Sequence, residues 1–286
     1  MARLGFVLHP QRIEARELAS QTVTWLIEQG HQCVLCHEDA ALLGRPDLGV
    51  DESAMADQLD LIVSLGGDGT MLRTVSLVAA CDVPVIGVNF GQLGYLTDVE
   101  PEQLNDVIQS VLQHAEIKEE RMLLQVEVLR GGTSDNHEVF LALNEAVVEK
   151  TSSGQTIRLD IALDGAKFTP YEADGVIIAT PTGSTAYAFS ARGPIVEPTH
   201  RAILLTPVSP HMLFDRTLVL DDDSDVVLTV AENRTGSLVI DGRTVGDLHA
   251  GDSVRCTASK HRAHLVLSSP RDFHAILKAK FGLSDR

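Results

Sequence analysis

Residues 60–65, Asp-Leu-Ile-Val-Ser-Leu, form a nearly all-apolar run that leads directly into Gly66-Gly67-Asp68-Gly69-Thr70. A strand of this composition must be covered on both faces, which is typical of a parallel sheet flanked by helices. The segment after the glycines, Met71–Ala80, has the pattern of a helix. A strand, a glycine-rich turn and a helix in this order predict an α/β unit whose ligand site lies at the carboxyl ends of the strands.

The first 120 residues repeat this alternation of strands and helices. One apolar face predicts a helix over residues 15–26 that is closed by Gly30, and another predicts a helix that starts at Pro101. Short apolar runs predict further strands at residues 4–8, 33–36 and 83–88. Residues 1–120 are therefore predicted to form an α/β domain with a Rossmann-like parallel sheet.

The pattern changes after Arg121, where short strands separated by turns replace the alternation. One strand is predicted to run unbroken from Glu138 to Val148, and Asp164-Gly165 indicates a hairpin turn. This pattern predicts a predominantly β, sandwich-like domain over residues 121–268. Residues 269–286 contain a final predicted helix at 270–281, which we expect to pack back on the first domain.

The chain is strongly acidic, because 23 Lys and Arg stand against 40 Asp and Glu, a net charge of −17 over 286 residues. Duplex nucleic acids and anionic membranes are usually met by basic surfaces, so this balance argues against both as partners. No apolar run is long enough for a membrane span or a signal peptide. Four cysteines do not indicate a disulfide scaffold in a chain of this length. We expect a cytoplasmic protein with no nucleic-acid or membrane partner.

The glycine loop has the features of a phosphate site. Glycines let the backbone approach a phosphate closely, and the helix that follows directs free N–H groups at the anion. The loop lacks the Gly-Lys-Ser/Thr sequence of a Walker loop. Asp68 is the unexpected residue, because a carboxylate repels phosphate. Asp68 either accepts a hydroxyl proton or holds a metal ion, or it is only a cap of the following helix.

Gly66-Gly67-Asp68-Gly69-Thr70 resembles the phosphate loop shared by NAD kinases, diacylglycerol-kinase-type lipid kinases and phosphofructokinases. Further motifs resemble those of the NAD kinases in order and spacing: Asn89–Leu96, Asn144-Glu145, Asp174-Gly175 followed by Ala179–Tyr187, and Pro207–His211. This resemblance extends over nearly the whole chain. A lipid kinase and a non-catalytic nucleotide-sensing module are the alternatives. The acidic charge disfavours the first, and the intact loop disfavours the second.

The resemblance implies ATP-dependent phosphorylation of the adenosine-ribose 2′-hydroxyl of NAD to give NADP, with Mg²⁺ or another divalent cation. Asp68 is the implied general base, and phosphoryl transfer requires one group of this kind. The residues implied at the phosphates of ATP are Gly66, Gly67, Gly69 and Thr70. The residues implied at NAD are Asp68, Gly69, Tyr95, Asn144, Glu145, Asp174, Thr182, Thr185, Ala186, Tyr187 and Ser190. No metal ligand is assigned, and the family implies a homodimer or homotetramer.

For several of these positions the sequence allows two interpretations. Tyr95 either flanks the adenine or packs in the core, and the hydroxyl-rich run Thr180–Tyr187 either binds ribose or is a turn before a helix. The family usually has two glycines where this chain has Arg192-Gly193, so Arg192 either bears backbone strain or adds a cation for phosphate. Glu172 is expected to favour the cationic nicotinamide of NAD over neutral NADH. ATP and polyphosphate both remain open as donors.

Overall fold

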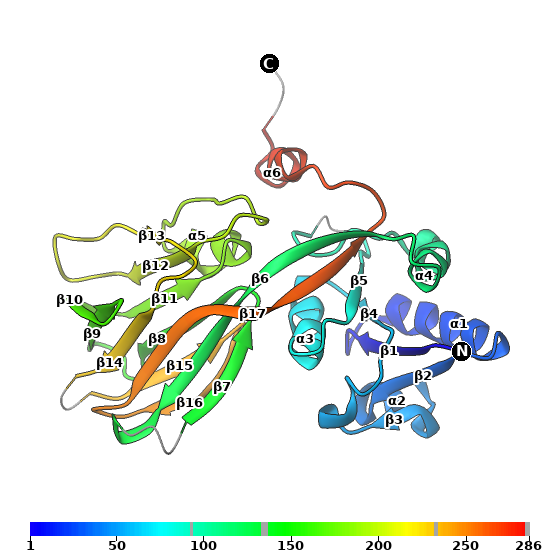
Figure 1. The fold of residues 1–286 in the computed structure, drawn as a ribbon, viewed down its shortest axis with the longest axis horizontal. Coiled ribbons are helices and arrows are strands. Elements are labelled where there is room, and N and C mark those ends of the chain that lie inside the picture. The colour runs from blue at the N-terminus through cyan, green and yellow to red at the C-terminus, as the bar shows by residue number, and fades with distance from the viewer. Residues whose placement is uncertain (92–93, 133–136, 232–233, 284–286) are drawn as a thin grey trace. The chain divides into compact units, whose positions relative to one another are not determined.

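The computed structural model describes residues 1–91, 94–132, 137–231 and 234–283. The chain divides into two compact units (Figure 1): the first comprises Met1–Glu120 with Ala263–Arg286, and the second comprises Arg121–Arg262. The predicted second domain ends at residue 268. The structure places it after Arg262, because the end of strand β17 (Ser253–Leu267) pairs in parallel with β5 (Pro84–Val88) of the first unit.

The first unit is built on a parallel sheet with the strand order β3-β2-β1-β4-β5-β17. Its other strands are β1 (Arg3–Leu8), β2 (Gln32–Cys36), β3 (Gly49–Val50) and β4 (Leu61–Leu65). Its α-helices are α1 (Ile13–Glu28), α2 (His37–Leu43), α3 (Asp68–Val78), α4 (Leu104–Leu112) and α6 (Phe273–Phe281). The predicted α/β fold with a parallel sheet is confirmed.

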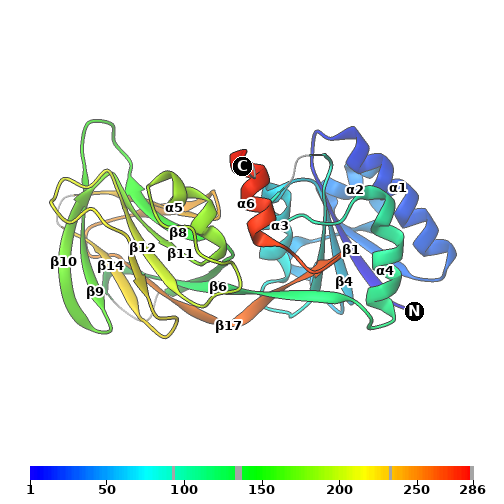
Figure 2. The same cartoon turned by 90° about the horizontal axis from the view of Figure 1, so that it is seen from above.

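Apolar helix faces cover this sheet on both sides. Helices α1 and α4 lie together on one side of the strands and α3 lies on the other (Figure 2). The residues of α1 that pack into this core are Ala15, Ala19, Val23 and Leu26, and those of α4 are Leu104, Ile108 and Val111. Strand β4 is buried at all of its positions, as its apolar sequence predicts. The covered strand ends at Leu65 and so presents the glycine loop at the carboxyl edge of the sheet.

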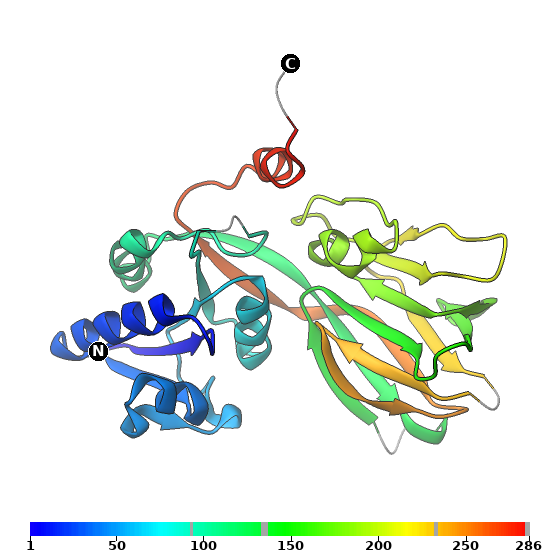
Figure 3. The same ribbon diagram turned by 180° about the vertical axis from the view of Figure 1, so that it is seen from behind.

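The second unit is a sandwich of two mainly antiparallel sheets. One sheet has the order β13-β12-β11-β8-β15-β16, and the other contains β10-β9-β14-β17 together with β6 and β7 (Figures 1 and 3). The strands are β6 (Ile117–Leu129), β7 (His137–Ala142), β8 (Glu145–Lys150), β9 (Ile157–Leu163), β10 (Ala166–Ala173), β11 (Gly175–Ala179), β12 (Ile203–Val208), β13 (Leu218–Leu220), β14 (Val226–Val230), β15 (Gly236–Ile240) and β16 (Arg243–Leu248). Buried side chains from both sheets form one large apolar core, and a smaller apolar cluster lies between β8, β11, β12 and α5 (Tyr187–Ser190). The predicted β-rich domain is confirmed.

The prediction of one strand from Glu138 to Val148 is wrong. The chain forms β7 in one sheet and β8 in the other, with the break at Leu143 and Asn144. The Asp241 carboxylate accepts hydrogen bonds from the backbone N–H groups of Leu143, Asn144 and Glu145 at the break. Apolar periodicity did not reveal the break, because the residues on both sides of it are equally apolar.

Helix α6 closes the first unit. The Asp272 side chain accepts a hydrogen bond from the Ala275 N–H at the start of this helix, and Gly282 ends it with a left-handed φ of +61°. The helix therefore begins slightly later than the predicted start at residue 270. In the ranges that the structure describes, no helix is both long enough and apolar enough to cross a membrane.

Arg192 occupies a position that favours glycine. It follows the short helix α5 (Tyr187–Ser190) with a φ of +67°. The Arg192 N–H donates to the Phe189 carbonyl and the Gly193 N–H donates to the Ala188 carbonyl, which is the Schellman arrangement of a helix end. The Arg192 side chain is exposed. The backbone conformation therefore supports the strain interpretation of Arg192.

We expect Arg192→Gly to increase the free energy of unfolding by about 1 kcal/mol, because the left-handed conformation costs a residue with a Cβ about 1–2 kcal/mol. Thermal unfolding followed by circular dichroism would show a midpoint about 2 °C higher. Arg192→Ala is the matched control, since it removes the charge and keeps the Cβ. A midpoint that rises equally in both variants would assign the effect to charge and contradict backbone strain.

Candidate active site

The glycine loop follows β4 and forms the start of α3. Gly67 is the extended residue that precedes the helix, and the Met71 N–H donates to its carbonyl at 3.1 Å. Gly66 is required by packing, because a Cβ there would overlap the Thr70 side chain. The helix begins at Asp68 rather than at the predicted Met71, so its free N–H groups lie within the loop itself.

A hollow of about 330 Å³ lies beside this loop. Its lining residues are Leu8, His9, Pro10 and Arg12 from the β1–α1 connection, and Gly67, Gly69, Thr70 and Arg73 from the loop and α3. These two segments meet because β1 and β4 are neighbours in the sheet. Glycine backbone, a helix N-terminus and two arginines suit a phosphate group.

Arg73 is held in this hollow by Asp39 of α2. Its Nη1 donates to Asp39 Oδ1 at 3.2 Å, its Nη2 lies 3.1 Å from Asp39 Oδ2 in an ion pair, and Asp39 is only 1% exposed. Burial raises the pKa of Asp39, and the Arg73 charge opposes that rise. Arg73, Arg12 and His9 were not among the predicted site residues. Arg12 and His9 could have been found from the sheet order. If β1 and β4 are neighbours in a parallel sheet, the connection after β1 must lie beside the connection after β4.

The Asp68 carboxylate is fixed by a separate segment of the first unit. Its Oδ2 accepts the Tyr95 N–H at 3.0 Å, and its Oδ1 accepts the Leu96 N–H at 3.1 Å. Asp68 makes no cap hydrogen bond, since the N-cap residue is Gly67. A Cβ at Gly94 would lie 2.5 Å from Asp68 Oδ1, so only glycine allows this approach. The helix-cap interpretation of Asp68 is therefore wrong.

Tyr95 lies beside Asp68 and is half-buried. The Lys280 ammonium of α6 lies 4.8 Å from the centre of its ring, within the range of a cation–π interaction. Burial and the Asp68 charge raise the pKa of the Tyr95 hydroxyl. This environment is not a core position, because the ring has a charged neighbour and partial solvent contact.

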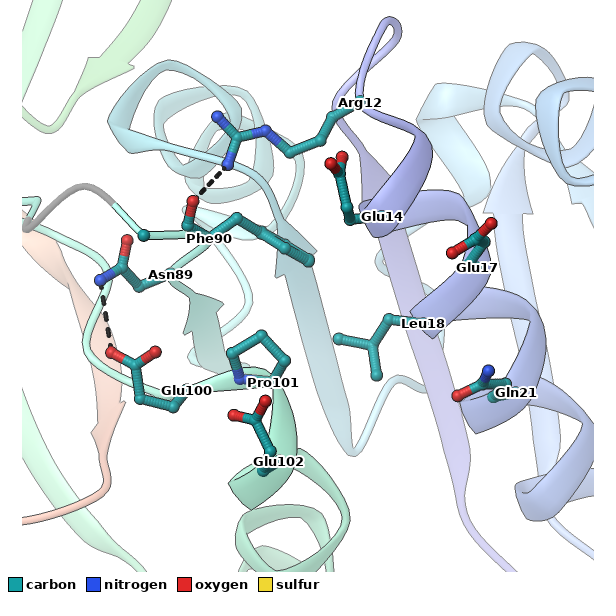
Figure 4. A pocket seen from close by; sticks show the side chains of 11 residues that line it. Arg12, Glu14, Glu17, Leu18, Gln21, Asn89, Phe90, Glu100, Pro101 and Glu102 are labelled. Atoms are coloured by element: carbon teal, nitrogen blue, oxygen red, sulfur yellow. Dashed lines mark hydrogen bonds between the residues drawn. The ribbon is translucent and has the colours of Figure 1, made fainter.

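A second hollow of the first unit, of about 620 Å³, is acidic (Figure 4). Leu18, Phe90 and Pro101 point toward one another within it, and its lining also includes Glu14, Glu17, Glu100 and Glu102. Arg12 donates to the Phe90 carbonyl at 3.0 Å and lies over the Phe90 ring. Four carboxylates repel phosphate, so the loop hollow suits an anion better than this acidic hollow does.

In the second unit, the strand break brings two predicted motifs together. Asp241 accepts the N–H groups of Leu143, Asn144 and Glu145 at 2.7, 2.8 and 3.1 Å. The Thr180 N–H donates to the Asn144 carbonyl at 2.8 Å. A Cβ at Gly183 would overlap that same carbonyl, so the turn after β11 needs glycine to lie against Asn144.

Glu145 is a buried acid at this position, with 7% exposure. Burial and the neighbouring Asp241 charge raise its pKa to about 8, against a smaller opposing effect of the Tyr187 N–H. Its Oε2 has no hydrogen-bond partner among the described residues. The raised pKa favours the neutral carboxyl group of Glu145, which can both donate and accept a hydrogen bond.

Some hydroxyl groups of the run Thr180–Tyr187 bond to other parts of the protein, and others are exposed to solvent. The Ser184 hydroxyl bonds both backbone groups of Val196, and the buried Thr182 hydroxyl accepts a hydrogen bond from Arg121 at 3.3 Å. The run forms η5 (Thr182–Thr185) and then α5. Both the side chain of Tyr187 and that of Ser190 are exposed.

Asp174 lies in a different setting in the second unit. Its carboxylate forms an ion pair with Lys150 at 2.5 Å, and both line a hollow of about 610 Å³ that also includes His211 and Arg234. Glu172 lines an adjoining hollow that shares Arg234, and its Oε1 accepts the Thr156 hydroxyl at 3.2 Å. The Pro207–His211 motif thus contributes His211 beside Asp174.

Two family models match the chain: the ATP-NAD kinase N-terminal domain over residues 4–117 and the ATP-NAD kinase C-terminal domain over residues 143–268. The chain belongs to the ATP-NAD kinase family. The NAD kinase of Heliobacterium modesticaldum is 38% identical with 98% of each chain covered, and that of Trichlorobacter lovleyi is 37% identical with 94% of each covered. The crystal structure of yeast NADH kinase complexed with NADH has a TM-score of 0.89 and 28% identity, covering all of this chain and 89% of the yeast chain.

In this member of the ATP-NAD kinase family, the predicted site residues form separate groups within each unit. In the first unit, the loop residues and Asp68 lie with Tyr95. In the second, Asn144 and Glu145 lie with the Thr180–Tyr187 turn, while Asp174 lines its own hollow. The Asn89–Leu96 motif includes Gln92 and Leu93, which lie outside the described residues.

We expect Glu145→Gln to remove part of the pH dependence of the free energy of unfolding. The folded chain keeps the Glu145 proton up to about pH 8, while the unfolded chain releases it near its ordinary pKa of 4.5. Stability therefore falls as pH rises between these values, by about 3–4 kcal/mol from pH 5 to pH 8. Urea unfolding at pH 5 and pH 8 measures this. Glu149→Gln, on the same strand, is the control; an equal pH dependence in the native chain and Glu145→Gln would contradict the assignment.

Proposed function

We propose that this chain transfers the γ-phosphoryl group of ATP to the adenosine-ribose 2′-hydroxyl of NAD, giving NADP, with Asp68 as the general base. The observation that carries the proposal is the placement of Asp68. A carboxylate stands within a phosphate-type glycine loop and is oriented by two N–H groups of another segment. That arrangement fits an acceptor of a hydroxyl proton next to a phosphate donor.

The chemistry requires positioning, charge neutralisation and one proton acceptor. The 2′-hydroxyl oxygen attacks the γ-phosphorus, the bond to the bridging oxygen of ADP breaks, and Asp68 takes the hydroxyl proton. Hydrogen bonds from Tyr95 and Leu96 leave lone pairs on both Asp68 oxygens, so the carboxylate can accept that proton. Arg73 and the loop N–H groups neutralise charge on the phosphates of the donor.

A divalent cation fits the donor set at the loop only in combination with the phosphates of ATP. Among the described residues, no group of three or more His, Cys, Asp or Glu is arranged to hold a metal ion. Mg²⁺ is commonly bound by one or two carboxylates together with substrate phosphates, and Asp68 is the carboxylate that the loop provides. When bound, the cation would neutralise phosphate charge during transfer.

Residues of the second unit recognise NAD in this proposal. Glu145, as a neutral acid, can donate a hydrogen bond to a nucleoside nitrogen or hydroxyl oxygen and accept another. Asn144 and Thr182 add polar groups at the same turn, together with the backbone of Thr185 and Ala186. Tyr187 and Ser190 supply exposed hydroxyls beside it. Asp174 and Glu172 provide carboxylates for the cationic nicotinamide end.

We also propose a cytoplasmic homodimer or homotetramer without nucleic-acid or membrane partners. Exposed apolar side chains of the second unit support self-association. Leu213 is 104% exposed, and the rings of Phe168 and Phe214 contact one another edge to face with 42% and 38% exposure. Apolar groups gathered in this way are commonly covered in an assembly.

A coupled assay of NADP formation tests the proposal, with ATP and polyphosphate as donors and NAD and NADH as acceptors. We expect turnover with ATP and NAD. Asp68→Asn should lower kcat by about 10²–10⁴-fold and change the KM for NAD less than about tenfold. Asp106→Asn, an exposed carboxylate on α4, is the matched control. Near-native turnover by Asp68→Asn would refute the base, and equal kcat/KM for NAD and NADH would refute the role of Glu172.

Arg73→Met should raise the KM for ATP about tenfold and leave the KM for NAD unchanged, because a charge-assisted contact to phosphate is lost. The same substitution combined with Asp39→Asn avoids an unpaired buried carboxylate. Steady-state kinetics with each substrate varied in turn provides the measurement. An unchanged KM for ATP in both variants would show that Arg73 serves only its ion pair with Asp39.

A further inference from the structure

The peptide group between Tyr95 and Leu96 is hydrogen-bonded on both of its sides. Its N–H, which belongs to Leu96, donates to Asp68 Oδ1 at 3.1 Å. Its carbonyl, which belongs to Tyr95, accepts a hydrogen bond from Arg271 Nη1 at 2.9 Å. One peptide group therefore connects the Arg271 guanidinium to the Asp68 carboxylate.

The side chain of Arg271 is buried within the first unit and does not lie on its surface. Its side chain is 3% exposed and lies 3.6 Å from Glu119 Oε1. Its Nη2 reaches the carbonyl of the next residue, Leu96, at 3.5 Å. A planar guanidinium can bond two successive carbonyls in this way, whereas an ammonium group lacks the fork geometry.

The segment that carries Arg271 is fixed at further points of the same loop. The Ser268 N–H and hydroxyl both donate to Asp98 Oδ2, at 2.9 Å and 2.8 Å. Beyond Arg271, Lys280 of α6 lies over the Tyr95 ring. Figures 1 and 3 show α6 at the end of an extended segment that follows β17. Residues 268–280 thus hold the backbone and the ring of Tyr95 together.

We propose that Arg271 is a positioning residue for Asp68, acting through the Tyr95–Leu96 peptide group. The proposal rests on the proposed function of Asp68 as the base. A cation at the carbonyl fixes the rotation of the peptide and polarises it, which strengthens the N–H bond on the other side. The carboxylate is then held in one orientation toward the hydroxyl. Small errors in such an orientation are costly for the rate of transfer.

A role of this kind acts on the chemical step and not on substrate affinity. Arg271→Met keeps most of the side-chain volume but removes both hydrogen bonds to the loop. We expect kcat to fall about tenfold, while the KM values for ATP and NAD stay within about twofold. Arg271→Lys should restore part of kcat, because it returns one cationic donor. Arg45→Met is the matched control, since Arg45 pairs with Asp47 at the surface, and its kcat should equal that of the native chain.

A double-mutant cycle separates positioning from general stability. In the Asp68→Asn background, Arg271→Met should cause no further loss of kcat, because the carboxylate that Arg271 positions is already absent. The same tenfold loss in both backgrounds would overturn the proposal, and so would native kcat in Arg271→Met. If Arg271→Met does not fold by circular dichroism, Arg271→Lys and Arg271→Gln supply the same cycle. Absence of NADP formation by the native chain would instead refute the proposed function.

Discussion

Burying a carboxylate is costly unless protein donors replace the hydrogen bonds that water supplied. Asp68 and Asp241 are both half-buried, and main-chain N–H groups from distant segments supply these donors. Asp68 accepts two of them from Tyr95 and Leu96, and Asp241 accepts three from residues 143–145. Each of these bonds gives a backbone N–H group a hydrogen-bond partner. The same bonds therefore fix the loop beside the base and the break between two sheets.

Local patterns in the sequence were enough to predict the two architectures. The apolar run of β4 and the alternation around it depend on neighbours within a few residues, so the parallel sheet could be predicted. Asp68 could be identified because a carboxylate conflicts chemically with a phosphate loop. The resemblance to NAD kinases then indicated Asn144 and Glu145, although it did not indicate why the chain bends there.

What the sequence did not reveal depends on contacts between distant residues. Arg73 meets Asp39 from another helix, and Arg271 reaches Tyr95 across 176 positions of the chain. The break at Asn144 depends on Asp241, 97 positions away. Neither apolar periodicity nor the residue types of turns indicates which distant residues will be in contact. The net charge of −17 was equally uninformative about the loop hollow, where Arg12 and Arg73 outnumber carboxylates among the lining residues.

The first unit is discontinuous in the sequence, and this affects the order in which the chain can fold during synthesis. Its parallel sheet gains the end of β17 as an edge only after the entire second unit has been translated. Domains usually fold in the order of their synthesis. Here the second unit is complete in sequence before the first, and the peptide that holds Asp68 receives Arg271 only after the whole second unit has been synthesised. Nascent chains that end before this point would contain the entire glycine loop without its support.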